Sequence, residues 1–167
     1  MIGKRAAWRA ALVMLTVGLA QAAPAVILLV RHGEPVKEAG DDPGLTAAGR
    51  QRAEALARVV AAWQAPGGKV RALFASERKR TQETLAPLGS ATGLKVTVVA
   101  AKDTAALVKQ VRAVKGGIVV VAGHSNTVPA IVEALSGVAG IAIADNEYDR
   151  LFAVTAAGVV ELRYGAK

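Results

Sequence analysis

The sequence predicts an α/β fold: a three-layer αβα sandwich whose central sheet is mainly parallel and ends in an antiparallel edge hairpin. Short apolar runs of strand length alternate with segments of helical periodicity, the pattern of strands buried on both faces. Residues 151–164 instead indicate two strands joined by a tight turn. The 167 residues, 53% of them hydrophobic, suffice for one well-buried core and are too few for two ordinary domains.

Four apolar runs predict the parallel strands. They comprise residues 26–30, 70–75, 94–100 and 118–122. The third run is rich in β-branched residues, which favour strands. The tail differs, because residues 151–155 and 159–164 flank Ala156-Ala157-Gly158, a hairpin signal. We therefore expect the hairpin to form the antiparallel edge of the sheet.

Four helices are expected to cover the sheet. The Thr46 hydroxyl can cap the first, and Pro66-Gly67-Gly68 ends it. The second spans residues 78–92, and Asp103 begins the third. The apolar faces consist of Ala53, Leu56, Ala57, Val60 and Trp63 in the first helix, Leu107, Val108, Val111 and Val114 in the third, and Val128, Ile131, Val132 and Leu135 in the fourth.

The first 22 residues have the pattern of an export signal. Their positive n-region contains Lys4, Arg5 and Arg9. An apolar run over residues 10–20 follows, and Ala20-Gln21-Ala22 offers the small residues that signal peptidase accepts. A membrane anchor, the alternative, needs about 20 apolar residues, more than this run contains. We expect cleavage after Ala22, a mature domain over residues 23–167 without stable membrane insertion, and a periplasmic or secreted location in a bacterium.

The basic charge of the chain does not by itself indicate a nucleic-acid partner. The formal net charge is +8, but the first 22 residues contribute three cations and no Asp or Glu. A modest basic excess in the remainder suits small anionic substrates as well as polymers. The chain has no cysteine, so it forms no disulfide and its compartment cannot be inferred from thiols.

Both histidines follow directly after predicted buried strands. His32 lies in Arg31-His32-Gly33-Glu34, and His124 lies in Gly123-His124-Ser125-Asn126. The carboxyl ends of parallel strands are where α/β folds assemble ligand sites, so these two distant rings can converge on one pocket. Ser125 and Asn126 are expected to cap the following helix, whose positive end then lies near a bound anion.

These residue types suit phosphoryl transfer. An imidazole nitrogen is a competent nucleophile, and a covalent intermediate divides a slow cleavage into two faster steps. The phosphoryl oxygens need cations around them, which arginine supplies through planar donors that stay charged. Gly33 would allow backbone amides to approach the anion, and a protonated His124 would supply a further donor.

Four motifs in order resemble the histidine phosphatase superfamily, the phosphoglycerate-mutase-like fold, over residues 26 to about 136. They are Arg31-His32-Gly33-Glu34, Leu45-Thr46-Ala47-Ala48-Gly49, residues 76–84 (SERKRTQET) and Gly123-His124-Ser125. The resemblance implies that His32 is the phosphorylated nucleophile, that Arg31, Arg80 and His124 form the phosphate pocket, and that neither a metal nor an organic cofactor is needed. Ser125, where the acid phosphatase branch has a His-Asp pair, makes the chain similar to the mutase-type branch.

The sequence departs from the larger family members in one respect. Only 22 residues separate Arg80 from Asp103, which leaves no room for the insertion that caps the site and brings a Glu as general acid. The chain therefore resembles the compact, small phosphohistidine-type phosphatases with an open pocket. Glu34, next to the nucleophile loop, and Asp103, at about the family's spacing from Arg80, are the two candidates for the acid. Each has a plain structural alternative, as a loop acceptor for Glu34 and as a helix cap for Asp103.

We expect an exported phosphatase that hydrolyses phosphomonoesters through a phosphohistidine on His32. The alternative is a non-catalytic phosphate or sugar-phosphate binding module that uses the same pocket. Nucleic-acid binding through the basic surface is a third option, which predicts steep salt dependence and indifference to His32→Ala. The partner we expect is a small phosphorylated substrate and no nucleic acid. The selectivity loops, residues 36–42 and 137–149, specify no leaving group, and the oligomeric state is open.

Overall fold

The computed structural model describes residues 23–37, 40–64 and 68–165, and these form six strands and four helices. In chain order the elements are β1 (Val26–Arg31), α1 (Ala47–Gln64), β2 (Val70–Ala75), α2 (Lys79–Thr92), β3 (Val96–Val98), α3 (Thr104–Ala113), β4 (Ile118–Gly123), α4 (Thr127–Ser136), β5 (Arg150–Thr155) and β6 (Gly158–Arg163). The alternation of strands and helices confirms the predicted α/β class.

The strands form one sheet in the order β3-β2-β4-β1-β5-β6. β1 pairs in parallel with β4, and β2 pairs in parallel with both β4 and β3. β5 runs antiparallel to β1, and β6 runs antiparallel to β5, which confirms the predicted edge hairpin. β3 is shorter than the predicted strand over residues 94–100. It pairs on one side only, and its Thr97 and Val98 side chains are exposed.

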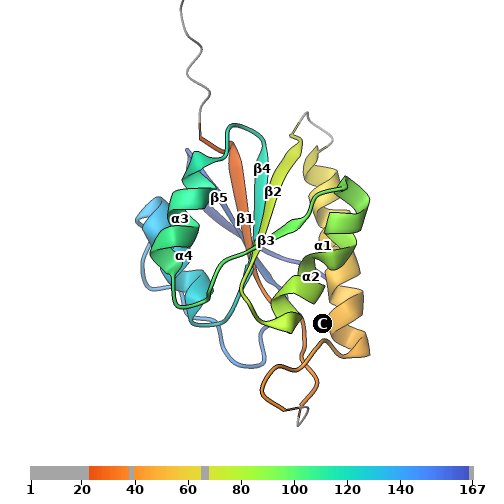
Figure 1. The fold of residues 1–167 in the computed structure, drawn as a ribbon. Coiled ribbons are helices and arrows are strands. Elements are labelled where there is room, and N and C mark those ends of the chain that lie inside the picture. The colour runs from red at the N-terminus through yellow and green to blue at the C-terminus, as the bar shows by residue number, and fades with distance from the viewer. Residues whose placement is uncertain (1–22, 38–39, 65–67, 166–167) are drawn as a thin grey trace, which may run out of the picture.

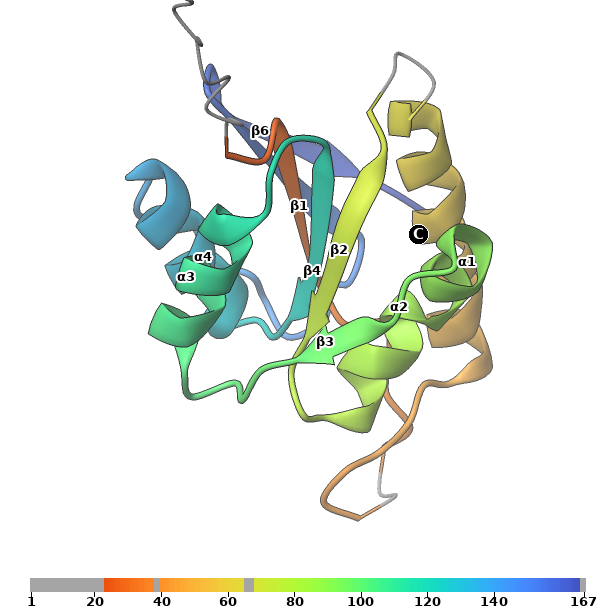
Figure 2. The same cartoon turned by 45° about the horizontal axis from the view of Figure 1, so that its top comes forward.

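Two layers of helices enclose the sheet (Figure 1). Helices α1 and α2 cover one face and α3 and α4 cover the other, as the tilted view in Figure 2 also shows. Alternate residues of β1 face the two layers, since Leu28 and Val30 pack on the α1 and α2 side while Ile27 and Leu29 pack on the other. The central strands are therefore buried on both faces, which explains their continuous apolar sequences.

The predicted side-chain caps are confirmed for α1 and α3 but not for α4. The Thr46 hydroxyl accepts the Gly49 N–H at 3.0 Å, and the Asp103 carboxylate accepts the Ala106 N–H at 2.9 Å. The expected side-chain cap of α4 is wrong, because Asn126 makes no side-chain capping bond. Instead the Thr127 hydroxyl accepts the N–H of His124 at 2.9 Å. The Thr127 hydroxyl therefore binds the loop that contains His124 rather than an N–H of the first turn of α4.

Two predictions concern residues outside the described part of the chain. The signal segment, residues 1–22, is one of them. The other is the Pro66-Gly67 part of the expected helix stop, although α1 does end at Gln64. Among the residues that are described, no helix combines the length and apolar character that crossing a bilayer requires.

Candidate active site

The two histidines converge because β1 and β4 are parallel neighbours. Arg31 at the end of β1 lies opposite Gly123 at the end of β4, and the N–H of His32 donates to the Gly123 carbonyl at 2.9 Å. The two imidazole rings meet edge to face, with 5.3 Å between their centroids. The sheet thus builds one site from chain segments about half the sequence apart.

The hydrogen bonds of His32 determine which of its nitrogens is free. Nδ1 lies 2.8 Å from the Gly33 carbonyl oxygen, which can only accept, so Nδ1 carries the proton. Nε2 accepts the Nε–H of Arg80 at 3.1 Å. The ring is only 4% exposed. His32 therefore presents an unprotonated Nε2 beside a guanidinium.

Burial keeps both rings neutral. Desolvation, with the Arg80 charge adding to it, lowers the pKa of His32 to about 4. The pKa of His124 is also lowered to about 4, again mainly by desolvation and then by Arg80. At neutral pH the lone pair on Nε2 of His32 is therefore available without a base to remove a proton.

The beginning of α2 holds the histidine loops together. Arg80 contacts His32, and the Thr84 hydroxyl accepts the N–H of Gly33 at 2.9 Å. The hydroxyl of Ser76, at the end of β2, lies 2.9 Å from Nε2 of His124 and 2.9 Å from the hydroxyl of Thr81. The spacing of residues 76–84 thus has a physical reason. Successive turns of α2 reach the loop after β1 through Arg80 and Thr84, whereas Ser76, which contacts Thr81, reaches His124 after β4.

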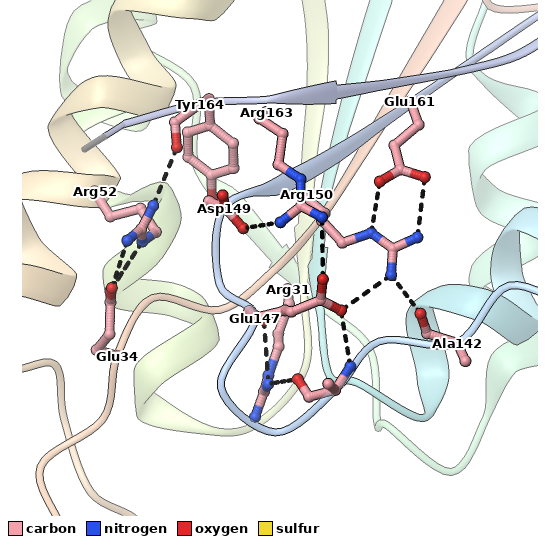
Figure 3. Close-up of polar contacts among 11 residues, drawn as sticks. Arg31, Glu34, Arg52, Ala142, Glu147, Asp149, Arg150, Glu161, Arg163 and Tyr164 are labelled. Atoms are coloured by element: carbon pink, nitrogen blue, oxygen red, sulfur yellow. Dashed lines mark hydrogen bonds and ion pairs between the residues drawn. The ribbon is translucent and has the colours of Figure 1, made fainter. Parts of the chain in front are cut away.

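Arg31 joins β1 to the loop before β5 and also borders the site. Its Nη1 contacts the carbonyl oxygens of Ala144, Asp145 and Glu147 at 2.8, 3.0 and 3.2 Å (Figure 3). The Tyr148 ring lies 4.1 Å from the guanidinium carbon. The Nε of Arg31 is buried and has no hydrogen-bond partner in the described structure. Most of this guanidinium is therefore used to fix the loop, which the sequence did not indicate.

Gly33 packs against the start of α1. Its N–H donates to the Thr84 hydroxyl, so any approach of backbone amides to phosphate at this loop stays a prediction. A Cβ at this position would come within 2.8 Å of the Gly49 carbonyl oxygen. The absence of a side chain lets the nucleophile loop lie against the start of α1.

Glu34 forms an ion pair with Arg52 of α1. Three contacts of 2.6 to 3.0 Å join the carboxylate and the guanidinium, and Arg52 also donates to the Tyr164 carbonyl at 3.0 Å (Figure 3). Although burial opposes it, hydrogen bonding to Arg52 lowers the pKa of Glu34. An ionised, paired carboxylate is poorly suited to donating a proton to a leaving group.

The second candidate acid, Asp103, is an exposed cap of α3. It does not border the depression that contains the two histidines, which has a volume of about 690 Å³. Glu77 does border it, together with Arg78, Arg80 and Lys102. The Glu77 carboxylate accepts the Ala101 N–H at 2.7 Å, and this bond lowers its pKa. Sequence reasoning missed Glu77, although its place directly after β2 was a signal.

A second depression of about 820 Å³ also borders Arg31 but contains neither histidine. Positively and negatively charged side chains line it and form ion pairs with one another, such as Arg163 with Glu147 and Asp149. These pairs account for Glu147 and Asp149 in the loop after α4. In the described part of the chain, no group of three or more His, Asp or Glu side chains is arranged to hold a metal ion.

The structure therefore brings together His32, His124, Arg31 and Arg80 around one depression and leaves Glu34 and Asp103 outside it. A buried, neutral imidazole beside an arginine at the carboxyl edge of a parallel sheet suits phosphoryl transfer. The family model of the histidine phosphatase superfamily (branch 1) matches residues 27–103, the region that contains His32 and Arg80. Over this stretch the chain is similar to that superfamily.

Solved structures show the same fold at low sequence identity. The protein histidine phosphatase SixA complexed with tungstate has a TM-score of 0.61 and 17% identity, over 84% of this chain and 96% of that one. A protein of Agrobacterium tumefaciens assigned as the phosphohistidine phosphatase SixA gives 0.59 and 19%, over 86% and 99%. The mycobacterial glucosyl-3-phosphoglycerate phosphatase with inorganic phosphate gives 0.57 and 17%, over 85% and 96%. No curated protein matches the sequence.

Proposed function

We propose that this phosphatase is exported and hydrolyses small phosphomonoesters through a covalent phosphohistidine on His32. The observation that carries the proposal is the orientation of the His32 ring. Its Nδ1–H is fixed on the Gly33 carbonyl, so the unprotonated Nε2 faces the cation of Arg80. A nucleophile and a phosphate-binding donor thus lie within one hydrogen-bond length of each other.

The first step forms a bond between Nε2 of His32 and phosphorus and breaks the phosphorus–oxygen bond to the alcohol. The alcohol oxygen leaves with the electron pair of that bond and takes up a proton from solvent. Arg80 shifts its donors from Nε2 to the phosphoryl oxygens as the lone pair is used. His124 and the buried Nε of Arg31 add donors on the same side. The positive charges of Arg31 and Arg80 stabilise the negative charge that grows on the three equatorial oxygens.

The second step transfers the phosphoryl group to water and restores the neutral ring. We assign Glu77 as the base of this step, since it is the carboxylate that borders the histidine depression and its lowered pKa keeps it ionised. It accepts a proton from the attacking water while the bond between Nε2 and phosphorus breaks. Glu34 is paired with Arg52 and Asp103 caps α3, so neither carboxyl group is placed to protonate the leaving group. We therefore expect substrates whose alcohols have a low pKa to react fastest, because these alcohols leave without a proton.

Export rests on the sequence. The cations Lys4, Arg5 and Arg9, the apolar run and the Ala20-Gln21-Ala22 site form the three parts of a cleavable signal. Expression of the full chain in a bacterium tests this part. We expect the periplasmic fraction to contain a protein whose mass corresponds to a chain that starts at Ala23, and retention of an uncleaved chain in the membrane would contradict it.

Phosphate release from a panel of phosphomonoesters tests the activity. The wild-type chain is expected to turn over repeatedly, and His32→Asn is expected to lose turnover while remaining folded. Thr92→Val is a suitable control, because its hydroxyl donates only within α2, to Leu88 at 2.8 Å and Gly89 at 3.5 Å. Binding of phosphate without turnover in the wild-type chain would favour a non-catalytic binding module.

A further inference from the structure

We infer that Ser76 is a positioning residue that fixes the tautomer of His124. Its hydroxyl oxygen accepts the Nε2–H of His124, so that Nδ1 is the nitrogen offered to the phosphoryl group. The assignment of a phosphoryl ligand rests on the proposed function, whereas the tautomer itself does not. The protons available in a small buried network determine this tautomer.

The network consists of three side chains at the meeting point of β2, β4 and α2. Ser76 is 5% exposed and Thr81 is fully buried, so water does not complete their hydrogen bonds. The Ser76 oxygen lies 2.9 Å from Nε2 of His124, 2.9 Å from the Thr81 hydroxyl and 3.2 Å from the Arg78 N–H. A hydroxyl with three partners donates to one and accepts from two.

Thr81 decides the direction of these bonds. Its hydroxyl lies 2.7 Å from the carbonyl oxygen of Arg78 and 3.1 Å from that of Ser76. Both oxygens can only accept, so the single Thr81 proton goes to a carbonyl, and the Thr81 oxygen is left to accept. Ser76 then donates its one proton to Thr81. The two remaining partners of Ser76, the Arg78 N–H and Nε2 of His124, must both be donors.

This result places the proton of neutral His124 on Nε2. Nδ1 is then unprotonated, and it has no hydrogen-bond partner among the described residues. When a phosphoryl anion enters, His124 can take up a second proton only at Nδ1, and that N–H then donates to a phosphoryl oxygen. In the opposite direction, Thr81 would donate to Ser76 and Ser76 to His124. The 2.7 Å hydrogen bond from Thr81 to the Arg78 carbonyl would then be lost.

Nitrogen-15 NMR of the imidazole rings tests the inference in the full protein, purified without a histidine tag. The sequence contains two histidines, so a His32→Asn variant assigns both rings by elimination. At neutral pH and without ligand, we expect His124 to show a protonated Nε2 and an unprotonated Nδ1. In Ser76→Ala the ring is expected to populate both tautomers, and kcat to fall about ten- to hundredfold with a smaller change in KM.

Thr92→Val is the matched control, since it removes another hydroxyl that donates to a backbone carbonyl of α2. It is expected to retain the wild-type tautomer and kcat. A wild-type His124 protonated on Nδ1, or a Ser76→Ala protein with an unchanged tautomer, would overturn the inference. The measurement on the wild-type protein tests the tautomer even if the Ser76→Ala variant does not fold. If the protein showed the Nε2–H tautomer but no turnover, the proposed function would fail and the inference would stand.

Discussion

The Nε–H of Arg80 donates to Nε2 of His32 over 3.1 Å, which places the arginine on the lone pair of that ring nitrogen. The hydrogen bond holds the ring in a fixed orientation before substrate arrives. It also means that an incoming phosphoryl group must replace Nε2 as the acceptor of Arg80. Orientation in the free protein and charge stabilisation in the reaction thus depend on one side chain.

Arg80→Ala is expected to lower kcat/KM by about a hundred- to a thousandfold, because a donor aimed at the developing charge is lost. The same change is expected to raise the pKa of His32, since Arg80 is one of the groups that lower it beside burial. Steady-state kinetics and an NMR titration of His32 measure the two effects. Arg78→Ala, which removes a more exposed cation of the same helix start, provides the comparison. Equal losses in both variants would contradict a specific role for Arg80.

Glu34→Gln tests whether Glu34 acts as an acid or as a partner of Arg52. The half-buried pair is joined by a 2.6 Å contact, so its loss is expected to lower the free energy of unfolding by about 1–3 kcal/mol. Urea unfolding measures this cost. We expect kcat to fall by the same factor for alcohols of high and low pKa. A selective loss for the poor leaving groups would instead identify Glu34 as the general acid.

Asp103→Asn is expected to affect neither leaving-group dependence nor kcat. Its carboxylate caps α3 through the Ala106 N–H, and asparagine is about as good a cap as aspartate. Asp103→Ala is expected to lower stability by about 1 kcal/mol through loss of the cap. Kinetics with a leaving-group series, together with thermal unfolding, separates the two roles. A large fall in kcat for Asp103→Asn would restore it as a catalytic candidate.

The free energy of unfolding is expected to fall as the pH is lowered from about 6.5 toward 5. Both histidines have a pKa of about 4 in the folded protein, below the ordinary value of 6.5. The unfolded chain therefore binds more protons in this window and is favoured by acid. The loss is on the order of 2 kcal/mol, and most carboxylates titrate below this range. His32→Asn should flatten the dependence, and a wild-type profile without a slope would refute the pKa shifts.

Gly33→Ala is expected to destabilise the protein by about 1–3 kcal/mol, the usual cost of overpacking. The added methyl group would lie 2.8 Å from the Gly49 carbonyl oxygen, and both groups belong to backbone that is fixed by other contacts. Chemical denaturation measures the change. A Gly33→Ala protein with wild-type stability would show that the two loops separate easily.

The sequence predicted the convergence of His32 and His124 because that convergence depends on local signals. Buried strands end where the apolar runs end, and parallel strands bring those ends to one edge. The four-residue spacing from Ser76 to Arg80 similarly places the arginine on the first turn of a helix. The three layers and the antiparallel edge hairpin followed from the alternation of periodicities, whereas the order of the strands in the sheet was not predicted.

Contacts between distant loops were not predictable in this way. Arg31 binds carbonyls of residues 144–147 and Glu34 binds Arg52, and neither pairing leaves a trace in composition or spacing. Each depends on how a loop folds back over the sheet edge. The absence of a side-chain cap at Asn126 and the bond from the His124 N–H to the Thr127 hydroxyl have the same origin, since that bond involves the histidine loop.

Detection of phosphate on His32 during turnover tests the central claim most directly. Protein mixed with a phosphomonoester, quenched in alkali within the first turnover and digested is expected to yield the His32 peptide with one phosphoryl group that alkali preserves and acid removes. His32→Asn should yield none. If the wild-type chain turns over substrate while that peptide remains unmodified at every quench time, water rather than His32 attacks phosphorus and the account is wrong.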